Sequence, residues 1–566
     1  MEKRIVECVP NFSEGRDKAI IRQITSAIES SGGVKLLDVD PGEATNRTVV
    51  TFVGSPEAVV EAAFAGVKRA AELIDMRRHK GAHPRMGATD VLPLIPICGI
   101  TLAECAELAR KLAERIAAEL HVPTYCYEAA AFAPERKNLA VCRAGEYEAL
   151  PEKLAHTASA PDFGVRPFDE GVARTGATTV GARDFLIAVN FNLNTTSTRR
   201  ANAIAFDVRE KGRPVREGNP ITGRVVKDAA GNPVMQPGTL PATKAIGWFI
   251  EEYGIAQVSM NITDISRTPL HAAFDEVCRK ADARGVRVTG TEIVGLVPKR
   301  ALVEAGKYFL RKQRRSTGVA EEEIVRIAVK SMGLDDLKPF DPAEKVIEYL
   351  LEAEVPKKRL IDMTCKAFAE ETASESPAPG GGSIAAYMGA LGAALGTMVA
   401  NLSSHKAGWD DRWEEFSDWA ERGQAVLAEL LHLVDEDTAA FNRIMAVFAM
   451  PKSTDEEKAA RSAALQEATL YATEVPLRTM KAASRVFEIV RAMASEGNPN
   501  SVSDAGVGAL AARSAVLGAC LNVKINAAGL KDRAVADALI AEAEALAAEA
   551  VRLEAEVLQI VESKIG

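Results

Sequence analysis

The sequence lacks the features of a nucleic-acid-binding, zinc-binding or disulfide-bonded protein. Its 566 residues carry a formal net charge of −9, whereas a nucleic-acid-binding domain is normally basic. Its eight cysteines are scattered, and no two stand at the CxxC spacing of zinc and redox motifs. No secretory leader is recognisable either. We therefore expect reduced thiols in a cytoplasmic protein with no nucleic-acid partner.

One segment is long and apolar enough to be mistaken for a membrane span. Residues 384–402 carry no charge and approach the ~20 residues that a spanning helix needs. They consist largely of Ala and Gly, with few of the bulky side chains that favour insertion. We expect no membrane span here, but a helix buried at the centre of a bundle.

The first three hundred residues predict alternating strands and helices. This order predicts an α/β (α+β) part made of two subdomains, each a sheet backed by helices, at 1–180 and 181–332. Residues 212–238 are rich in Gly, Pro, Asn and Arg and predict an exposed insertion. The strands are expected at 4–9, 34–39, 48–53, 90–97, 123–127, 185–192, 244–251, 256–263 and 286–289, and helices at 102–120, 198–211, 270–283, after Ser55 and from Lys299.

The pattern changes after about residue 335. Residues 333–358 predict a linker, and 359–566 contain no convincing strand. The last helix has a heptad pattern that predicts packing against another helix. We therefore expect a multi-domain chain whose C-terminal part is an all-α bundle that self-associates. The heptad positions are Ala543, Ala550 and Val557 on one line and Leu546, Leu553 and Ile560 on the other.

The most informative stretch is HKGAHPRMG, residues 79–87. It places two of the seven histidines, His79 and His83, beside the cations Lys80 and Arg85. Histidine titrates near neutrality and suits proton transfer, and the cations suit an anionic substrate. The loop therefore predicts an acid/base site that handles carboxylates.

Two other interpretations of this loop are open. His79 and His83 stand four apart, as in a helical metal pair, but Gly81 and Pro84 disfavour a continuous helix and no adjacent carboxylate completes a zinc set. We expect no metal. A structural loop is the plainer alternative. The catalytic interpretation needs a carboxylate to orient the imidazole, and Asp38 and Asp40 at the end of a predicted strand are candidates.

A second motif, SPAPGGGS at 376–383, precedes the apolar helix. Gly380, Gly381, Gly382 and Ser383 expose backbone N–H groups at a helix start, which can bind phosphate or carboxylate. The Walker lysine and the GxGxxG spacing are absent, so a nucleotide loop is disfavoured. A tight N-cap that lets helices approach is the alternative.

Further along, residues 433–437 put three carboxylates in an apolar helical setting. A solvated acidic face is the default interpretation, but an inward-facing carboxylate would have a raised pKa and could act as a general acid. Residues 498–504, which end at Asp504, and the pair Asn522 and Asn526 add polar groups that could contact a heterocycle or join helices.

These motifs together resemble the formimidoyltransferase-cyclodeaminase family, bifunctional folate enzymes of histidine breakdown. The resemblance covers almost the whole chain. In the first half it rests on VECVPNFSEG (6–15), LLDVDPGEATNRTV (36–49), IDMRRHKGAHPRMGATDV (74–91), RAGEYEALP (143–151) and AQVSMN (256–261), and in the second on SPAPGGGS, LVDEDTAAF, ALQEAT and the helix of Asn522 and Asn526.

The resemblance implies roles for individual residues. The family's transferase histidine falls on His83, its carboxylate partner on Asp40 and its cyclodeaminase acid on Asp437. A folate-contacting stretch falls on Gly164 to Gly176. The implied substrates are N-formimidoyl-L-glutamate and tetrahydrofolate, the latter expected to be polyglutamylated, with no metal. His79 is expected to be structural.

Carboxylates on both implied substrates need cationic contacts. Arg47, Lys80 and Arg85 are our choices, and these three are inferred from charge alone. Two rival functions stay open: a formyltransferase fused to a methenyltetrahydrofolate cyclohydrolase, and a non-catalytic scaffold that binds folate or a partner through the helical seam.

Overall fold

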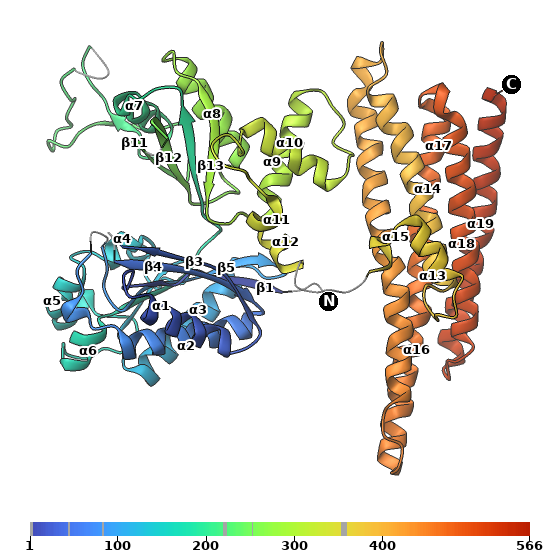
Figure 1. Cartoon of the computed structure of the whole chain (residues 1–566), viewed down its shortest axis with the longest axis horizontal. Coiled ribbons are helices and arrows are strands. Elements are labelled where there is room, and N and C mark those ends of the chain that lie inside the picture. The colour runs from blue at the N-terminus through green and yellow to red at the C-terminus, as the bar shows by residue number, and fades with distance from the viewer. Residues whose placement is uncertain are drawn as a thin grey trace. The chain divides into compact units, whose positions relative to one another are not determined.

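The N-terminal region is built on a mixed seven-stranded sheet with helices α1, α2 and α3 on one face (Figure 1). The computed structural model describes residues 4–43, 46–81, 84–218, 223–251, 253–352 and 359–565. β1 and β2 follow one another between β4 and β5, and each pairs antiparallel with both. β3 pairs with β4, and β7 joins β5 to β6 in parallel. The strands are β1 (Ile5–Cys8), β2 (Asn11–Phe12), β3 (Val34–Gly42), β4 (Arg47–Gly54), β5 (Thr89–Cys98), β6 (Thr124–Glu128) and β7 (Thr178–Ala182), and the helices α1 (Lys18–Ser30), α2 (Pro56–Leu73) and α3 (Leu102–Leu120).

Local capping explains where two of these helices begin. The Thr101 hydroxyl accepts a hydrogen bond from the Glu104 N–H, and the Glu104 carboxylate accepts one from the Thr101 N–H, which is a capping box. Ser55 caps α2 ahead of Pro56. Such caps each stabilise a helix by about 1 kcal/mol. Both predicted helix starts are confirmed.

A second, four-stranded antiparallel sheet has the order β11-β12-β8-β13, with α7 and α8 on one face. On the opposite face a chain of hydrogen bonds crosses the strands: Trp248 Nε1 donates to Gln257, Gln257 to Asn192, and Asn192 to Asp336. Because an indole only donates and a carboxylate only accepts, the direction of every bond is fixed. The elements are β8 (Ile187–Leu193), α7 (Thr198–Val208), β11 (Thr243–Ile250), β12 (Ile255–Ile262), α8 (Leu270–Asp282) and β13 (Val288–Val294).

Shorter elements connect these layers. Within the expected insertion, the short strands β9 and β10 pair with each other, and the described side chains around them are mostly exposed or half-buried. The elements are α4 (Leu139–Cys142), α5 (Leu150–Ala155), α6 (Glu170–Thr175), β9 (Arg213–Pro214) and β10 (Met235–Gln236).

Residues 333–352, expected to be part of a linker, are folded against the second sheet. The Thr291 N–H donates to the Gly333 carbonyl at 2.9 Å, and Val346 forms a bridge with Val297. Two short helices, α11 (Pro342–Lys345) and α12 (Ile347–Glu352), lie here. Folded structure thus continues to residue 352, and residues 353–358 lie outside the described residues.

The C-terminal region consists of helices, and the residues described from 359 to 565 contain no strand. Residues 303–331 belong to the same compact unit, whereas 332–354 belong with the α/β region. The Thr317 N–H donates to the Ser417 hydroxyl at 3.0 Å, which fastens this segment to the helices. The helices are α9 (Lys299–Lys312), α10 (Glu321–Met332), α13 (Cys365–Thr372), α14 (Gly381–Ser404), α15 (Trp413–Phe448), α16 (Asp455–Ser484), α17 (Val486–Glu496), α18 (Val502–Ala527) and α19 (Arg533–Ile565).

α14 is the expected apolar helix. It and the helical segment 499–527 are long and apolar enough to span a membrane, but 61% of the apolar stretch of α14 is buried inside the protein, as in a core helix. Along α19, Ala543, Ala550 and Val557 are buried, which confirms the predicted heptad. The expected multi-domain layout, an α/β part followed by an all-α bundle, is confirmed.

Candidate functional site

In the loop 79–87, the described residues show a histidine held as a neutral ring. Ala82 and His83 lie outside the described residues. His79 is buried, with its Nε2 2.8 Å from the Asn46 carbonyl oxygen, and its Nδ1 accepts a hydrogen bond from Arg85 Nε at 3.2 Å. Together these contacts assign the proton to Nε2. Burial also lowers the pKa of His79. The geometry supports a structural role for this ring.

Asn46 ties the loop to two other segments, and sequence reasoning missed it. Its side-chain oxygen accepts from the Gly15 N–H at 3.0 Å, and its amide nitrogen donates to the Lys80 carbonyl at 3.1 Å. Its backbone has φ +48°, a left-handed conformation that Asn tolerates better than most residues. Its signal in the sequence was its place within the motif at 36–49, between the strands expected at 34–39 and 48–53.

The cations expected to bind substrate carboxylates differ in their contacts within the protein. Lys80 is exposed and lines a pocket of about 410 Å³ with Gly81, Arg85 and Glu148. Arg85 donates twice to Glu148, at 2.8 Å each, and once to Glu146 at 3.2 Å. These bonds raise the pKa of Arg85 and leave its charge neutralised within the protein.

Arg47 belongs to a second cluster, which contacts the loop through Met86. Its guanidinium donates to Asp90 and to Asn11, and Arg143 donates to the same Asp90 oxygen at 2.9 Å. The other Asp90 oxygen accepts the Met86 N–H at 2.9 Å. Asp90 is completely buried. Neither Asp90 nor Arg143 was predicted, because only the fold brings them together.

Asp40 lies on β3 opposite Val49 and is exposed. Asp38 stands two residues away, and its pKa is raised by partial burial and by the negative charge of Asp40. The pairing of Asp40 with His83 stays a prediction.

The expected folate stretch meets the loop through glycines. Gly176 ends α6 with φ +68° and forms a bridge with Gly87. A Cβ on Gly176 would lie 2.2 Å from the Met86 carbonyl oxygen, so only glycine allows this contact. Gly164, at the other end of the stretch, has φ +72°. Both glycines therefore have a backbone requirement.

In the helical unit, Asp437 on α15 faces the glycine turn that begins α14. The Ser383 hydroxyl has one proton to donate and two acceptors within reach, Asp437 Oδ2 at 3.1 Å and the Val434 carbonyl oxygen at 2.9 Å. A Cβ on Gly382 would lie 2.1 Å from Asp437 Oδ1. Burial raises the pKa of Asp437, against the opposing effect of hydrogen bonds from the Ser383 hydroxyl and N–H. Gly382 has no side chain, and this leaves the space that the Asp437 carboxylate occupies.

The three carboxylates of the acidic run have different partners. Asp435 accepts the Leu360 N–H at 2.6 Å, and Glu436 accepts the Tyr471 hydroxyl. Asp437 thus differs from both neighbours in facing the turn of α14. This is the inward-facing carboxylate that the sequence analysis considered.

Of the remaining predicted residues, some lie near the Asp437 cluster and one lies far from it. A Cβ on Gly381 would lie 3.5 Å from the Asn522 amide, so Asn522 belongs beside the turn headed by Gly380. Asn526 donates to the Ala472 carbonyl at 2.6 Å and joins α18 to α16. Asp504 lies at the opposite end of α18, about 27 Å from Asn522 by helix rise. The structure does not bring Asp504 to this cluster.

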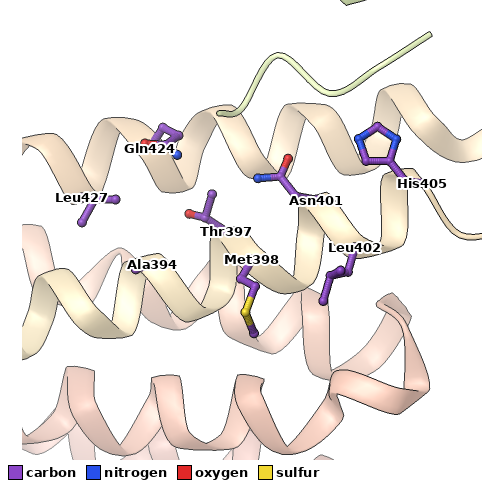
Figure 2. Close-up of a pocket in the computed structure, with 8 residues that line it drawn as sticks. All are labelled: Ala394, Thr397, Met398, Asn401, Leu402, His405, Gln424 and Leu427. Carbon is purple, nitrogen blue, oxygen red and sulfur yellow. The ribbon is translucent and has the colours of Figure 1, made fainter. Parts of the chain in front are cut away.

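A separate pocket of about 390 Å³ lies between α14 and α15, as Figure 2 shows. Thr397 and Asn401 extend from α14 into it, and Gln424 and Leu427 line it from α15. Gln424 is about 20 Å from Asp437 along the helix. This pocket is therefore distinct from the Asp437 cluster. No group of three or more His, Cys, Asp or Glu side chains suited to a metal occurs among the described residues.

Comparison with known proteins covers both units. Family models match residues 5–183 (formiminotransferase domain, N-terminal subdomain), 188–352 (formiminotransferase domain) and 364–545 (formiminotransferase-cyclodeaminase). The formimidoyltransferase-cyclodeaminase of Rattus norvegicus is 43% identical over 94% of this chain and 93% of its own.

Two shorter relatives each match one part of the chain. A glutamate formimidoyltransferase of Streptococcus pyogenes is 41% identical over 54% of this chain and 94% of its own. A methenyltetrahydrofolate cyclohydrolase of Methylorubrum extorquens is 40% identical over 36% of this chain and 97% of its own.

Proposed function

Because the chain belongs to the formimidoyltransferase-cyclodeaminase family, we propose that it is a bifunctional folate-dependent enzyme. It transfers the formimidoyl group of N-formimidoyl-L-glutamate to tetrahydrofolate. It then cyclises 5-formimidoyltetrahydrofolate to 5,10-methenyltetrahydrofolate and releases ammonia. The transferase part extends to residue 352, where its second family match ends, and the cyclodeaminase part occupies 359–566. Its place is the cytoplasmic degradation of histidine, and the folate carries a polyglutamate tail.

In the transfer step, N-5 of the folate attacks the amidine carbon and loses a proton, the bond from that carbon to the glutamate nitrogen breaks, and glutamate leaves with a proton on its nitrogen. His83 takes that proton, and Asp40 fixes the imidazole tautomer and stabilises the imidazolium. A positioned base of this kind contributes about 10²- to 10⁴-fold in rate. The hydrogen bonds of Asn46 and His79 support this assignment, because they hold both sides of the loop in place.

In the cyclisation step, N-10 attacks the same carbon and the amine leaves as ammonia. An amide anion is a poor leaving group, so the departing nitrogen needs a proton. Asp437 supplies it, and the observation that carries this proposal is the contact of its carboxyl with Gly382 and Ser383. Burial there raises its pKa and favours the protonated form that a general acid requires.

The test is a two-step assay that follows ammonia and methenyl absorbance together. His83→Ala should abolish transfer but still release ammonia from supplied 5-formimidoyltetrahydrofolate. Asp437→Asn should do the reverse. If His83→Ala also failed with the supplied intermediate, the separate-site proposal would be wrong.

The cyclohydrolase relative favours one alternative, a formyltransferase fused to a methenyltetrahydrofolate cyclohydrolase. The same assay separates the two functions. Ammonia released in equal amount to the methenyl product supports deamination. Hydrolysis of methenyltetrahydrofolate without ammonia supports the alternative.

We also propose that the chain forms a homo-oligomer through α14 and α18. Exposed or half-buried apolar side chains follow α14 at spacings of three and four residues, as in a coiled-coil seam. A matching line runs along α18, and Leu395 and Met388 lie within 4 Å of the Cβ positions of its Gly508 and Gly518. The seam contains Ile384, Met388, Leu391, Leu395, Met398 and Leu402 on α14 and Val507, Leu510, Leu517, Leu521 and Ile525 on α18.

An apolar face of this extent on a charged protein is typical of an interaction surface. Leu391→Lys should lower the mass measured by sedimentation equilibrium. Val551→Lys, at an exposed position of α19, serves as the control and should not. An unchanged mass for Leu391→Lys would exclude this seam as the interface.

A further inference from the structure

Two arginine clusters beside the loop 79–87 differ in charge balance. In the first, Arg85 contacts two carboxylates, Glu146 and Glu148, so its charge is fully compensated. In the second, Arg47 and Arg143 contact a single carboxylate, Asp90. The second cluster therefore carries one surplus positive charge within the described residues.

This surplus charge is poorly hydrated. The side chains of Arg47 and Arg143 are 10% and 15% exposed, and Asp90 is 0% exposed. Burial, together with the neighbouring charge of Arg143, lowers the pKa of Arg47, while Asp90 opposes that change. Like charges at low exposure repel each other and are costly unless a further anion joins them.

One donor of the cluster is also unpaired. The Nε–H of Arg143 is buried and has no hydrogen-bond partner among the described residues. Buried donors in native proteins are nearly always satisfied by protein, water or a bound group. Because Arg143 Nη2 already donates to Asp90, the unpaired Nε–H is the donor left for a further anion, and it can form one charge-assisted hydrogen bond to a carboxylate.

The cluster is also fastened directly to the loop. Asp90 accepts the N–H of Met86, which belongs to that loop, and Arg143 precedes Gly145 and Glu146 of the neighbouring pocket. We propose that Arg47 and Arg143 form a carboxylate-binding subsite of the transferase, with Asp90 setting their spacing. This inference rests on the proposed function, in which both substrates carry glutamate carboxylates.

In this subsite, Arg143 takes the place of Arg85 as the second arginine that contacts a substrate carboxylate. Arg85 is neutralised by its own carboxylates, whereas Arg143 supplies an unpaired Nε–H. A substrate carboxylate would balance the cluster at two cations and two anions. The subsite would therefore favour a formimidoyl donor that carries a carboxylate. A donor with a neutral amide in its place would leave the surplus positive charge of the cluster uncompensated.

The test is Arg143→Met in the full-length chain. The KM for N-formimidoyl-L-glutamate should rise about 10- to 100-fold, the effect of losing a charge-assisted hydrogen bond. Ammonia release from supplied 5-formimidoyltetrahydrofolate should not change. The thermal midpoint should stay the same or rise, because Arg47 and Asp90 remain as a balanced pair. Arg143→Lys, which keeps the charge, should restore part of the affinity.

A matched control is Arg136→Met. Arg136 pairs one-to-one with Asp162 at 2.7 Å, and its side chain is 18% exposed. Removing it leaves a carboxylate without its cation, so the thermal midpoint should fall while both KM values stay within about twofold, a difference near the error of such measurements. A merely structural Arg143 would behave like Arg136.

A measurement without catalysis uses glutarate as the probe. Glutarate should raise the thermal midpoint of the wild type in a saturable way, and Arg143→Met should need at least about tenfold more. This result would support the subsite even if the chain transferred no formimidoyl group. A rise in KM only for glutamylated folates would assign the carboxylate to the folate tail. Unchanged KM values and an unchanged glutarate response would overturn the proposal.

Discussion

In the α/β unit, ionisable groups near the loop 79–87 lie in networks. Arg85 is balanced by Glu148, His79 is held between Arg85 and Asn46, and Asp90 joins two arginines. In the helical unit, Asp437 lies against glycine and serine on rigid helices, with its pKa raised by burial. The first region distributes charge among many partners, and the second isolates one carboxyl.

This difference determines which kind of substitution should impair each region most. A network tolerates loss of volume but depends on the direction of each hydrogen bond. An isolated carboxyl depends on the shape of the space around it, because desolvation sets its pKa. Steric changes should therefore impair the helical site most, and hydrogen-bond changes the α/β site.

The largest expected effect is that of Gly382→Ala on cyclisation. The added methyl would lie 2.1 Å from Asp437 Oδ1 and must displace it. Ammonia release from 5-formimidoyltetrahydrofolate should fall about 10²- to 10⁴-fold, as on removal of a positioned acid. Gly506→Ala in α18 meets only ordinary contacts at 3.4 Å and is the control. Equal activity of the two variants would refute the steric argument.

Glu7→Gln asks whether desolvation is also costly in the α/β unit. Glu7 is 2% exposed, and burial raises its pKa from 4.5 to about 7. The folded state therefore holds this proton more tightly than the unfolded state, and stability falls as pH rises from 4.5 through about 7. Above that range the variant should gain about 3 kcal/mol of unfolding free energy.

The measurement for Glu7→Gln is denaturant unfolding at pH 4 and pH 8.5. The variant and the wild type should converge at the lower pH, where both side chains are neutral. A constant difference across the range would show that the ionisation of Glu7 is not its source.

Asn46→Ala should reduce transfer about tenfold, the size of one to two lost hydrogen bonds, while leaving cyclisation unchanged. It removes the bonds to Gly15 and Lys80, and it places alanine at φ +48°, which alanine tolerates less well than asparagine does. Asn46→Gly relieves the backbone strain but restores neither bond. If Asn46→Gly recovered full transfer in steady-state assays, strain and not hydrogen bonding would be the cause.

The smallest effect is that of Asp437→Asn on stability. Its raised pKa means that the ionised carboxyl destabilises the fold as pH rises above the ordinary Asp range. At pH 8 the thermal midpoint of the helical unit should therefore rise. Calorimetry at pH 8 should show this rise, and a lowered midpoint would contradict it.

Much of the fold followed from local signals in the sequence. The helix predicted at 102–120 has those bounds because Thr101 and Glu104 form a capping box and the apolar positions follow helical spacing. Strand β7 was not predicted, since its short run Thr178–Ala182 is buried by parallel neighbours. The strand expected at 286–289 is observed as β13, which continues to Val294 because it pairs with β8 across an irregularity after Val288.

The sites were predictable only in part, because contacts between segments far apart in the sequence form them. Gly382, Ser383 and Asp437 were each singled out, yet 54 residues separate the serine from the carboxylate it contacts. Asn46, Asp90 and Arg143 lie within the motifs at 36–49, 74–91 and 143–151, but nothing in those motifs gave them a role. Their roles come from contacts between segments that the fold alone brings together, so no spacing rule identifies them.

The hydrogen-bonded chain that begins at Trp248 has an optical consequence. Trp248 is the only one of the four tryptophans outside the helical unit, where Trp409 stacks on Phe416. Its indole N–H is held by Gln257, so its emission reports on the order of the second sheet. Trp248→Phe would leave a fluorescence signal from the bundle alone, and subtraction would resolve the melting of each unit within one intact chain.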